Sequence, residues 1–192
     1  MPAGFGWIAS ARGWMERASH ALVDGGDVWL VDPVDVPGLD ARIAEAGRPR
    51  AVLRLLARHD RDCARIARRL GVPLLVAPPS VPDAPFEAFA VGGERGSRET
   101  ALWWPGPRVL VVPETLGTAR YYCAPGEALG VHPFARVRRP PAILLRYRPD
   151  LLLVGHGPGL HEDVPALIER AVRRARRDLP RTLPRIVTAW RG

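Results

Sequence analysis

Short apolar runs of strand length alternate with segments of helical spacing along most of the chain. The clearest example lies between residues 50 and 77. An apolar run at 50–57 precedes a loop, a segment with apolar residues on one side and arginines on the other, and a second apolar run at 72–77. Gly71 favours a helix end, because glycine readily takes the left-handed conformation after the last turn. The pattern therefore predicts a strand, a crossover helix over 64–71 and a parallel strand.

The rest of the chain follows the same alternation. Two apolar runs flank the residues Asp-Gly-Gly-Asp at 24–27 and predict a β-hairpin, because both glycines can take positive φ angles. Further helices are predicted over 39–46, 140–147 and 163–179, and further strands over 86–91, 100–104, 108–112 and 151–154. We interpret 78–85 and 118–131 as loops. With 192 residues, the chain is long enough for one core, so we predict a single α/β domain over residues 1–192.

Composition narrows the class of protein. A hydrophobic content of 47% with 25% charged residues is ordinary for a soluble globular chain. No apolar run approaches the roughly 20 residues of a membrane span, and residues 1–10 lack the features of a secretion signal. The two cysteines lie far apart and indicate no disulfide framework. We therefore expect a cytoplasmic protein without a membrane partner.

The charge is strongly positive. All 28 basic residues are arginines, and the formal net charge is +8. A complete lack of lysine is typical of codon bias in a GC-rich genome, and a basic balance is also typical of nucleic-acid binding. Nucleic acid therefore stays a candidate partner beside an unidentified small molecule.

Candidate chemistry gathers where predicted strands end. His59, Arg61, Asp62 and Cys63 lie together in the loop after the strand at 50–57. His156 lies between two glycines directly after the strand at 151–154. In open α/β sheets, ligands bind outside the carboxyl ends of the strands, which is where these loops lie.

The loop at 59–63 resembles the His-x-His-x-Asp-His motif of the metallo-β-lactamase fold superfamily. We match His59, Arg61, Asp62 and Cys63 to it, so that arginine and cysteine replace two histidines. In the superfamily a Gly-Val-Pro strand follows the motif's helix, as at 71–73 here. The resemblance implies a four-layer αββα sandwich.

Two more segments extend the resemblance. The Gly-His-Gly at 155–157 is similar to the last ligand signature of the superfamily, and Glu114 stands where its members carry an aspartate that bridges two metal ions. The middle histidine of the first metal site has no counterpart, because residues 78–113 contain no histidine. The resemblance thus implies a degraded binuclear site, in which His59 is the one ligand of the first metal that this sequence keeps.

The matched residues leave one metal site that could function. Asp62, Cys63 and His156, with Glu114 nearby, offer oxygen, sulfur and nitrogen ligands that zinc accepts. Arg61 brings a permanent cation that cannot ligate a metal, so we expect it to fill the cavity by pairing with Asp62 or Glu114.

Three hypotheses for function follow. The first is a non-hydrolytic or weakly active protein of this fold, without a metal, that keeps the cleft for binding. The second is a hydrolase with a single zinc ion, in which Asp62 and His156 are the catalytic residues. The third is a basic nucleic-acid-binding protein, which rests on charge and fold.

Overall fold

The computed structural model describes residues 4–9, 15–59, 61–92, 98–137 and 140–189. Its first sheet has the strand order β1-β2-β3-β4-β5. The strands are β1 (Gly4–Ala9), β2 (Arg17–Asp24), β3 (Asp27–Val31), β4 (Arg48–Arg54) and β5 (Leu74–Val76). Strands β2 and β3 form the predicted hairpin, and β3, β4 and β5 run parallel to one another. The predicted β-α-β unit is therefore confirmed.

The second sheet has the order β11-β8-β7-β6. Its strands are β6 (Glu87–Gly92), β7 (Glu99–Trp104), β8 (Val109–Val112) and β11 (Leu151–Val154). Strand β11 pairs in parallel with β8, and a small ladder of β9 (Leu116–Gly117) and β10 (Gly130–Val131) lies beside this sheet. The parallel pair places the ends of β8 and β11 side by side, and Glu114 and His156 follow these ends.

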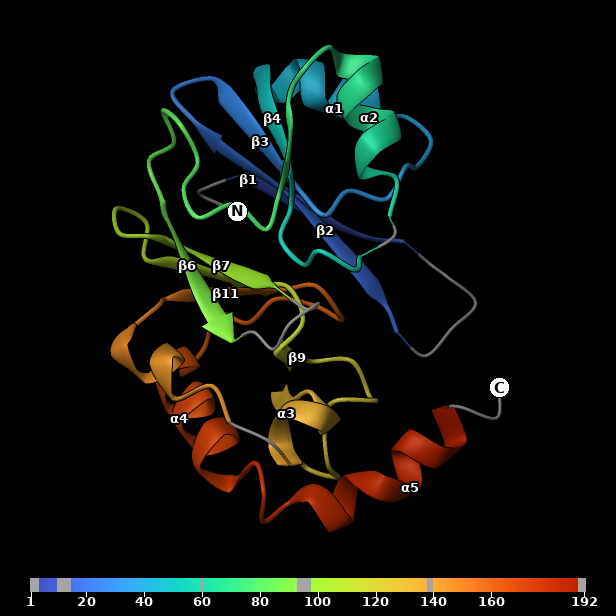
Figure 1. Ribbon diagram of the computed structural model, residues 1–192, viewed down its shortest axis with the longest axis vertical. Coiled ribbons are helices and arrows are strands. Elements are labelled where there is room, and N and C mark those ends of the chain that lie inside the picture. The colour runs from blue at the N-terminus through green and yellow to red at the C-terminus, as the bar shows by residue number, and fades with distance from the viewer. Residues whose placement is uncertain (1–3, 10–14, 60, 93–97, 138–139, 190–192) are drawn as a thin grey trace.

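Helices cover the outer face of each sheet, which gives the layers α, β, β and α (Figure 1). Helices α1 (Leu39–Ala46) and α2 (Cys63–Leu70) pack on the first sheet, and α4 (Val164–Arg174) packs on the second. The chain also forms α3 (Pro133–Val137), a 3-10 helix over Ala142–Arg146, and α5 (Leu179–Ala189).

Side-chain alternation along the strands fills the three spaces between these layers. Val28 and Leu30 of β3 face α1 and α2, whereas Trp29 and Val31 face the second sheet. Leu110 in β8 faces α4 on the far side of the second sheet. Both sheets are thus apolar on both faces, as expected for buried central layers.

Several predicted elements differ from the structure. The helix predicted over 163–179 ends already at Arg174, and a new helix, α5, begins at Leu179, since Pro180 lacks the N–H of a continuous helix and crowds the preceding turn. The helix predicted over 140–147 is a short 3-10 helix, and the predicted loop at 118–131 ends in strand β10. Strand β1 was not predicted. In the part of the chain that the structure describes, no helix is long and apolar enough to span a membrane.

Candidate metal centre

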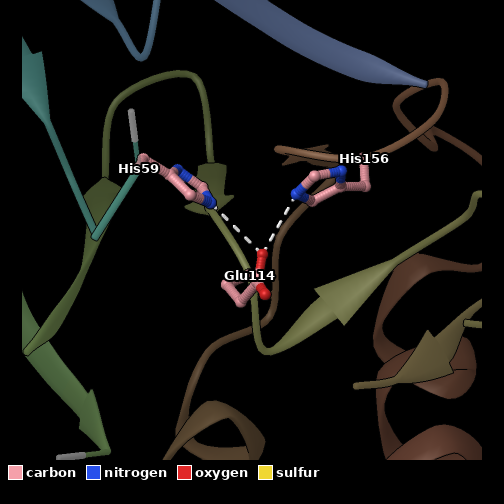
Figure 2. A group of neighbouring side chains, drawn as sticks. All are labelled: His59, Glu114 and His156. Atoms are coloured by element: carbon pink, nitrogen blue, oxygen red, sulfur yellow. Dashed lines mark hydrogen bonds and ion pairs between the residues drawn. The ribbon is translucent and has the colours of Figure 1, made fainter. Parts of the chain in front are cut away.

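Three side chains converge at the edge where the two sheets meet. His59 follows β4, Glu114 follows β8 and His156 follows β11. One ligand atom from each lies within 4.8 Å of the others. Oε2 of Glu114 is 3.2 Å from Nε2 of His59 and 3.0 Å from Nε2 of His156, so both imidazoles point at the same oxygen (Figure 2).

Both imidazoles are held in place through their other nitrogen. Nδ1 of His156 lies 2.7 Å from the carbonyl oxygen of Met15, and Nδ1 of His59 lies 3.2 Å from Oδ2 of Asp32. A carbonyl oxygen can only accept, so His156 donates from Nδ1. A carboxylate favours the same arrangement at His59. In the neutral rings, both Nε2 atoms then carry a lone pair toward Glu114.

Asp32 owes its position to an unusual backbone conformation. Its φ angle is 43°, in the left-handed region that aspartate enters more readily than most residues. The residue is buried, and its Oδ1 accepts the backbone N–H of Leu55 at 3.2 Å. Both carboxylate oxygens are therefore engaged, which fixes the oxygen that faces His59.

Glu114 is surrounded by positive and donating groups. Oε1 is 2.9 Å from Nη2 of Arg58 and 3.4 Å from Nε2 of His132, and Oε2 accepts the Tyr122 hydroxyl at 3.2 Å. Burial raises the pKa of the Glu114 carboxyl, but contacts with His156 and His59 outweigh it and hold this pKa far below the usual range. Glu114 is thus an anion at neutral pH.

These residues fit a metal ion by ligand type and spacing. Two imidazoles and a glutamate form the protein ligands of some catalytic zinc sites. With zinc bond lengths of about 2.0–2.2 Å, two ligand atoms at the tetrahedral angle lie roughly 3.4 Å apart. The observed separations of 3.0 and 3.2 Å differ from that value by a few tenths of an ångström.

A buried unpaired nitrogen supports the same fit. Among the residues that the structure describes, Nε2 of His156 is buried and has no hydrogen-bond partner, although Oε2 of Glu114 lies at ion-pairing distance. A lone pair that faces a carboxylate is unfavourable unless a proton or a cation lies between them. A metal ion at this point would satisfy both nitrogens and the carboxylate together.

A proton is the other cation that could lie there. Burial lowers the pKa of His59, but contacts with Asp32 and Glu114 outweigh it and raise this pKa above its ordinary value. Burial lowers the pKa of His132 to about 4, against the pull of Glu114. A protonated His59 therefore competes with a metal ion for Oε2 of Glu114, whereas His132 is neutral.

Two predicted ligands do not join the group. Asp62 begins α2, and its oxygens bind the backbone N–H of Asp35 and the side chain of Arg65. Cys63 is buried between α2 and the first sheet, and burial raises the pKa of its thiol to about 12. The predicted zinc site of Asp62, Cys63 and His156 is therefore not assembled.

The spacing of the motif explains this error. In His-x-His-x-Asp-His, the aspartate lies four residues after the first histidine, and the last histidine lies five residues after the first histidine. Asp62 and Cys63 follow His59 by three and four residues. If His59 is the first histidine of the motif, Asp62 and Cys63 each lie one residue too close to it to be the aspartate and the last histidine of the motif.

Arg61 is half-buried but does not make the predicted ion pair. Its guanidinium donates to the backbone carbonyls of Ala18, Asp32 and Gly155, with distances of 3.1 Å to Asp32 and 2.8 Å to Gly155. The predicted pairing with Asp62 or Glu114 was therefore wrong. Glu114 pairs with Arg58 instead, and Arg61 joins the first sheet to the loop that carries His156.

Sequence reasoning assigned no role at this site to Asp32, Arg58, Tyr122 or His132. His132 and Tyr122 lie in or beside loops without periodicity, so nothing in their local pattern indicates which way they face. For Asp32, an acidic residue at the end of a buried strand was an available signal.

Solved structures with a similar fold include metallo-β-lactamases. DIM-1 metallo-β-lactamase superposes with a TM-score of 0.58 at 15% identity, over 88% of this chain and 90% of that chain, and the same enzyme exposed to ceftazidime gives the same values. TMB-1 superposes with a TM-score of 0.57 at 10% identity, over 88% and 92%. No protein-family model and no curated protein matches the sequence. The chain has the metallo-β-lactamase fold, as predicted.

Proposed function

We propose that the protein is a hydrolase of the metallo-β-lactamase fold that works with one metal ion, held by His59, Glu114 and His156. The observation that carries the proposal is the convergence of two imidazole Nε2 atoms on one carboxylate oxygen. Zinc is the metal that this ligand set favours. Bound there, it would supply Lewis-acid polarisation of a carbonyl or phosphoryl group and activation of water.

The neighbouring residues of the chain would prepare the ligands. Asp32 and the carbonyl of Met15 orient the two imidazoles, and such outer partners commonly affect metal affinity by about 10- to 100-fold. Arg58 is half exposed beside Glu114 and presents its cation at the rim of the site. It is therefore placed to contact a negatively charged group of a substrate.

Metal analysis tests the proposal. Protein stripped with a chelator and reloaded should bind about one equivalent of zinc, as expected for one set of ligands. Glu114→Gln and His156→Gln should each lower the affinity by about 10-fold or more. His161→Gln is the matched control, because His161 is exposed. Less than about 0.1 equivalents bound by the native protein would refute the proposal.

A second reading rests on the ion pair of Glu114 with Arg58. This 2.9 Å contact and a protonated His59 can balance the carboxylate without a metal. The protein would then be a non-hydrolytic protein that binds a small molecule in the cleft. The same metal analysis separates the two functions, because this alternative requires no zinc at any stage.

A further inference from the structure

The two oxygens of Glu114 lie in different surroundings. Oε2 faces the Nε2 atoms of His59 and His156, which are the proposed ligands. Oε1 faces Arg58 and His132, at 2.9 and 3.4 Å. Rotation of the carboxylate would exchange these contacts, so whatever holds Oε1 also fixes Oε2.

His132 has its tautomer fixed by its own loop. The backbone N–H of Phe134 donates to Nδ1 of His132 at 3.4 Å, so this nitrogen carries no proton. The proton of the neutral ring is then on Nε2, the atom that faces Oε1 of Glu114. The imidazole is also packed between aromatic rings, with Tyr122 on one side and Phe134 on another, which restrict its rotation.

We infer that His132 is a positioning residue for the metal site. With its Nε2 at 3.4 Å from Oε1, the imidazole acts with Arg58 to hold the Glu114 carboxylate so that only Oε2 is offered to the metal. The inference rests on the proposed function, because it assigns a role to a residue that does not ligate. It also explains how glutamate can serve here as a ligand through one oxygen.

Two substitutions separate the two contacts of His132. In His132→Asn, the amide oxygen can still accept the N–H of Phe134, but the side chain is too short to reach Glu114. In His132→Gln, the amide nitrogen can still donate to Oε1, while the contact with Phe134 is lost. A purely structural role predicts similar losses in both variants, whereas a positioning role predicts a loss in His132→Asn alone.

The experiment measures zinc affinity by competition with a chelator and the visible absorption of the cobalt-substituted protein. His132→Asn should bind zinc about 10- to 100-fold more weakly. Its cobalt absorption should weaken, because a freed carboxylate can offer both oxygens and raise the coordination number. His132→Gln should retain most of the affinity and the native spectrum.

The outcomes distinguish the inference from the proposed function. Native affinity and an unchanged cobalt spectrum in His132→Asn would overturn the role of His132 and leave the metal site standing. An equal loss in both variants would show a structural role and would also overturn it. If the native protein binds neither metal, the proposed function fails and this inference fails with it.

Discussion

Glu114 replaces the aspartate expected at the end of β8, and its longer side chain changes what the position can do. One carboxylate oxygen faces two imidazoles while the other pairs with Arg58. A shorter side chain at the same backbone position could not span both sets of partners. The single side chain of Glu114 therefore contacts both groups of partners.

His20 is another buried histidine with an unusual environment. Its Nε2 lies 2.9 Å from the carbonyl oxygen of Val154, so that nitrogen donates, and its buried Nδ1 has no hydrogen-bond partner in the described part of the chain. Burial lowers the pKa of His20 to about 4. An unfolded histidine titrates near pH 6.5, so between about pH 4 and 6.5 the unfolded chain binds a proton that the folded chain does not.

This difference predicts acid sensitivity. The free energy of unfolding should fall as the pH drops from 7 toward 4, by up to roughly 3 kcal/mol from His20. His20→Gln keeps a donor for Val154 and removes the titration, so its stability should depend less on pH. Urea unfolding at pH 7, 6 and 5 measures the slope. His161→Gln, at an exposed position, should keep the native slope, and an unchanged slope in His20→Gln would contradict the prediction.

Among the elements, the loop before α2 has a structural task that its sequence did not indicate. Arg61 donates to carbonyls at the start of β2, after β3 and after β11, so one side chain ties both sheets together. Asp32 contacts His59, and Gly155 directly precedes His156 in the chain. Rigid placement of the two imidazoles therefore depends on Arg61, although it contacts neither ring's Nε2.

Removal of the Arg61 guanidinium should lower the free energy of unfolding. Arg61→Met removes one donor from each of three carbonyls, but those of Asp32 and Gly155 keep the Ser19 hydroxyl and the Ala18 N–H as donors. We expect a loss of about 1–3 kcal/mol in the free energy of unfolding, measured with urea, as for one buried carbonyl left unpaired. Arg65→Gln, on the exposed face of α2, should cost within about 1 kcal/mol. Equal losses in the two variants would show that Arg61 ties nothing together.

The sequence predicted elements better than it predicted contacts between them. The β-α-β unit at 50–77 was predicted correctly because hydrophobic period and a terminal glycine act locally. The directions of the side chains around α2 were not predicted correctly, because a shift of one position in the match turns a residue by about 100° around the helix axis. Cys63 therefore faces the core, although it had been matched to a metal ligand.

At the scale of the whole molecule, the candidate site spans the join between the two sheets. His59 comes from the first sheet, and Glu114 and His156 come from the second. The resemblance to the metallo-β-lactamase fold superfamily predicted the αββα layers, and it matched Glu114 and His156 to the same site. His132 could not be placed in this way, since its position depends on contacts made only in the folded chain.

A ligand that joins both sheets should stabilise the fold as a unit. Zinc at about 100 times its Kd would add about 2.7 kcal/mol to the free energy of unfolding. For a chain of this size, that corresponds to a rise of about 5–10 °C in Tm. Thermal unfolding at increasing zinc concentration measures the shift. His161→Gln should respond as the native protein does, and Glu114→Gln should show a smaller rise in Tm over the same range.

Hydrogen exchange of the individual strands shows where the metal binds. If zinc bridges the sheets, hydrogen exchange should slow together at the ends of β4, β8 and β11, because local opening at any of them breaks a ligand contact. Slowing at one strand alone, or a rise in Tm that is as large in Glu114→Gln as in the native protein, would place the ion elsewhere. Binding to the cysteines or histidines of the unfolded chain would reduce the shift without changing which strands are protected.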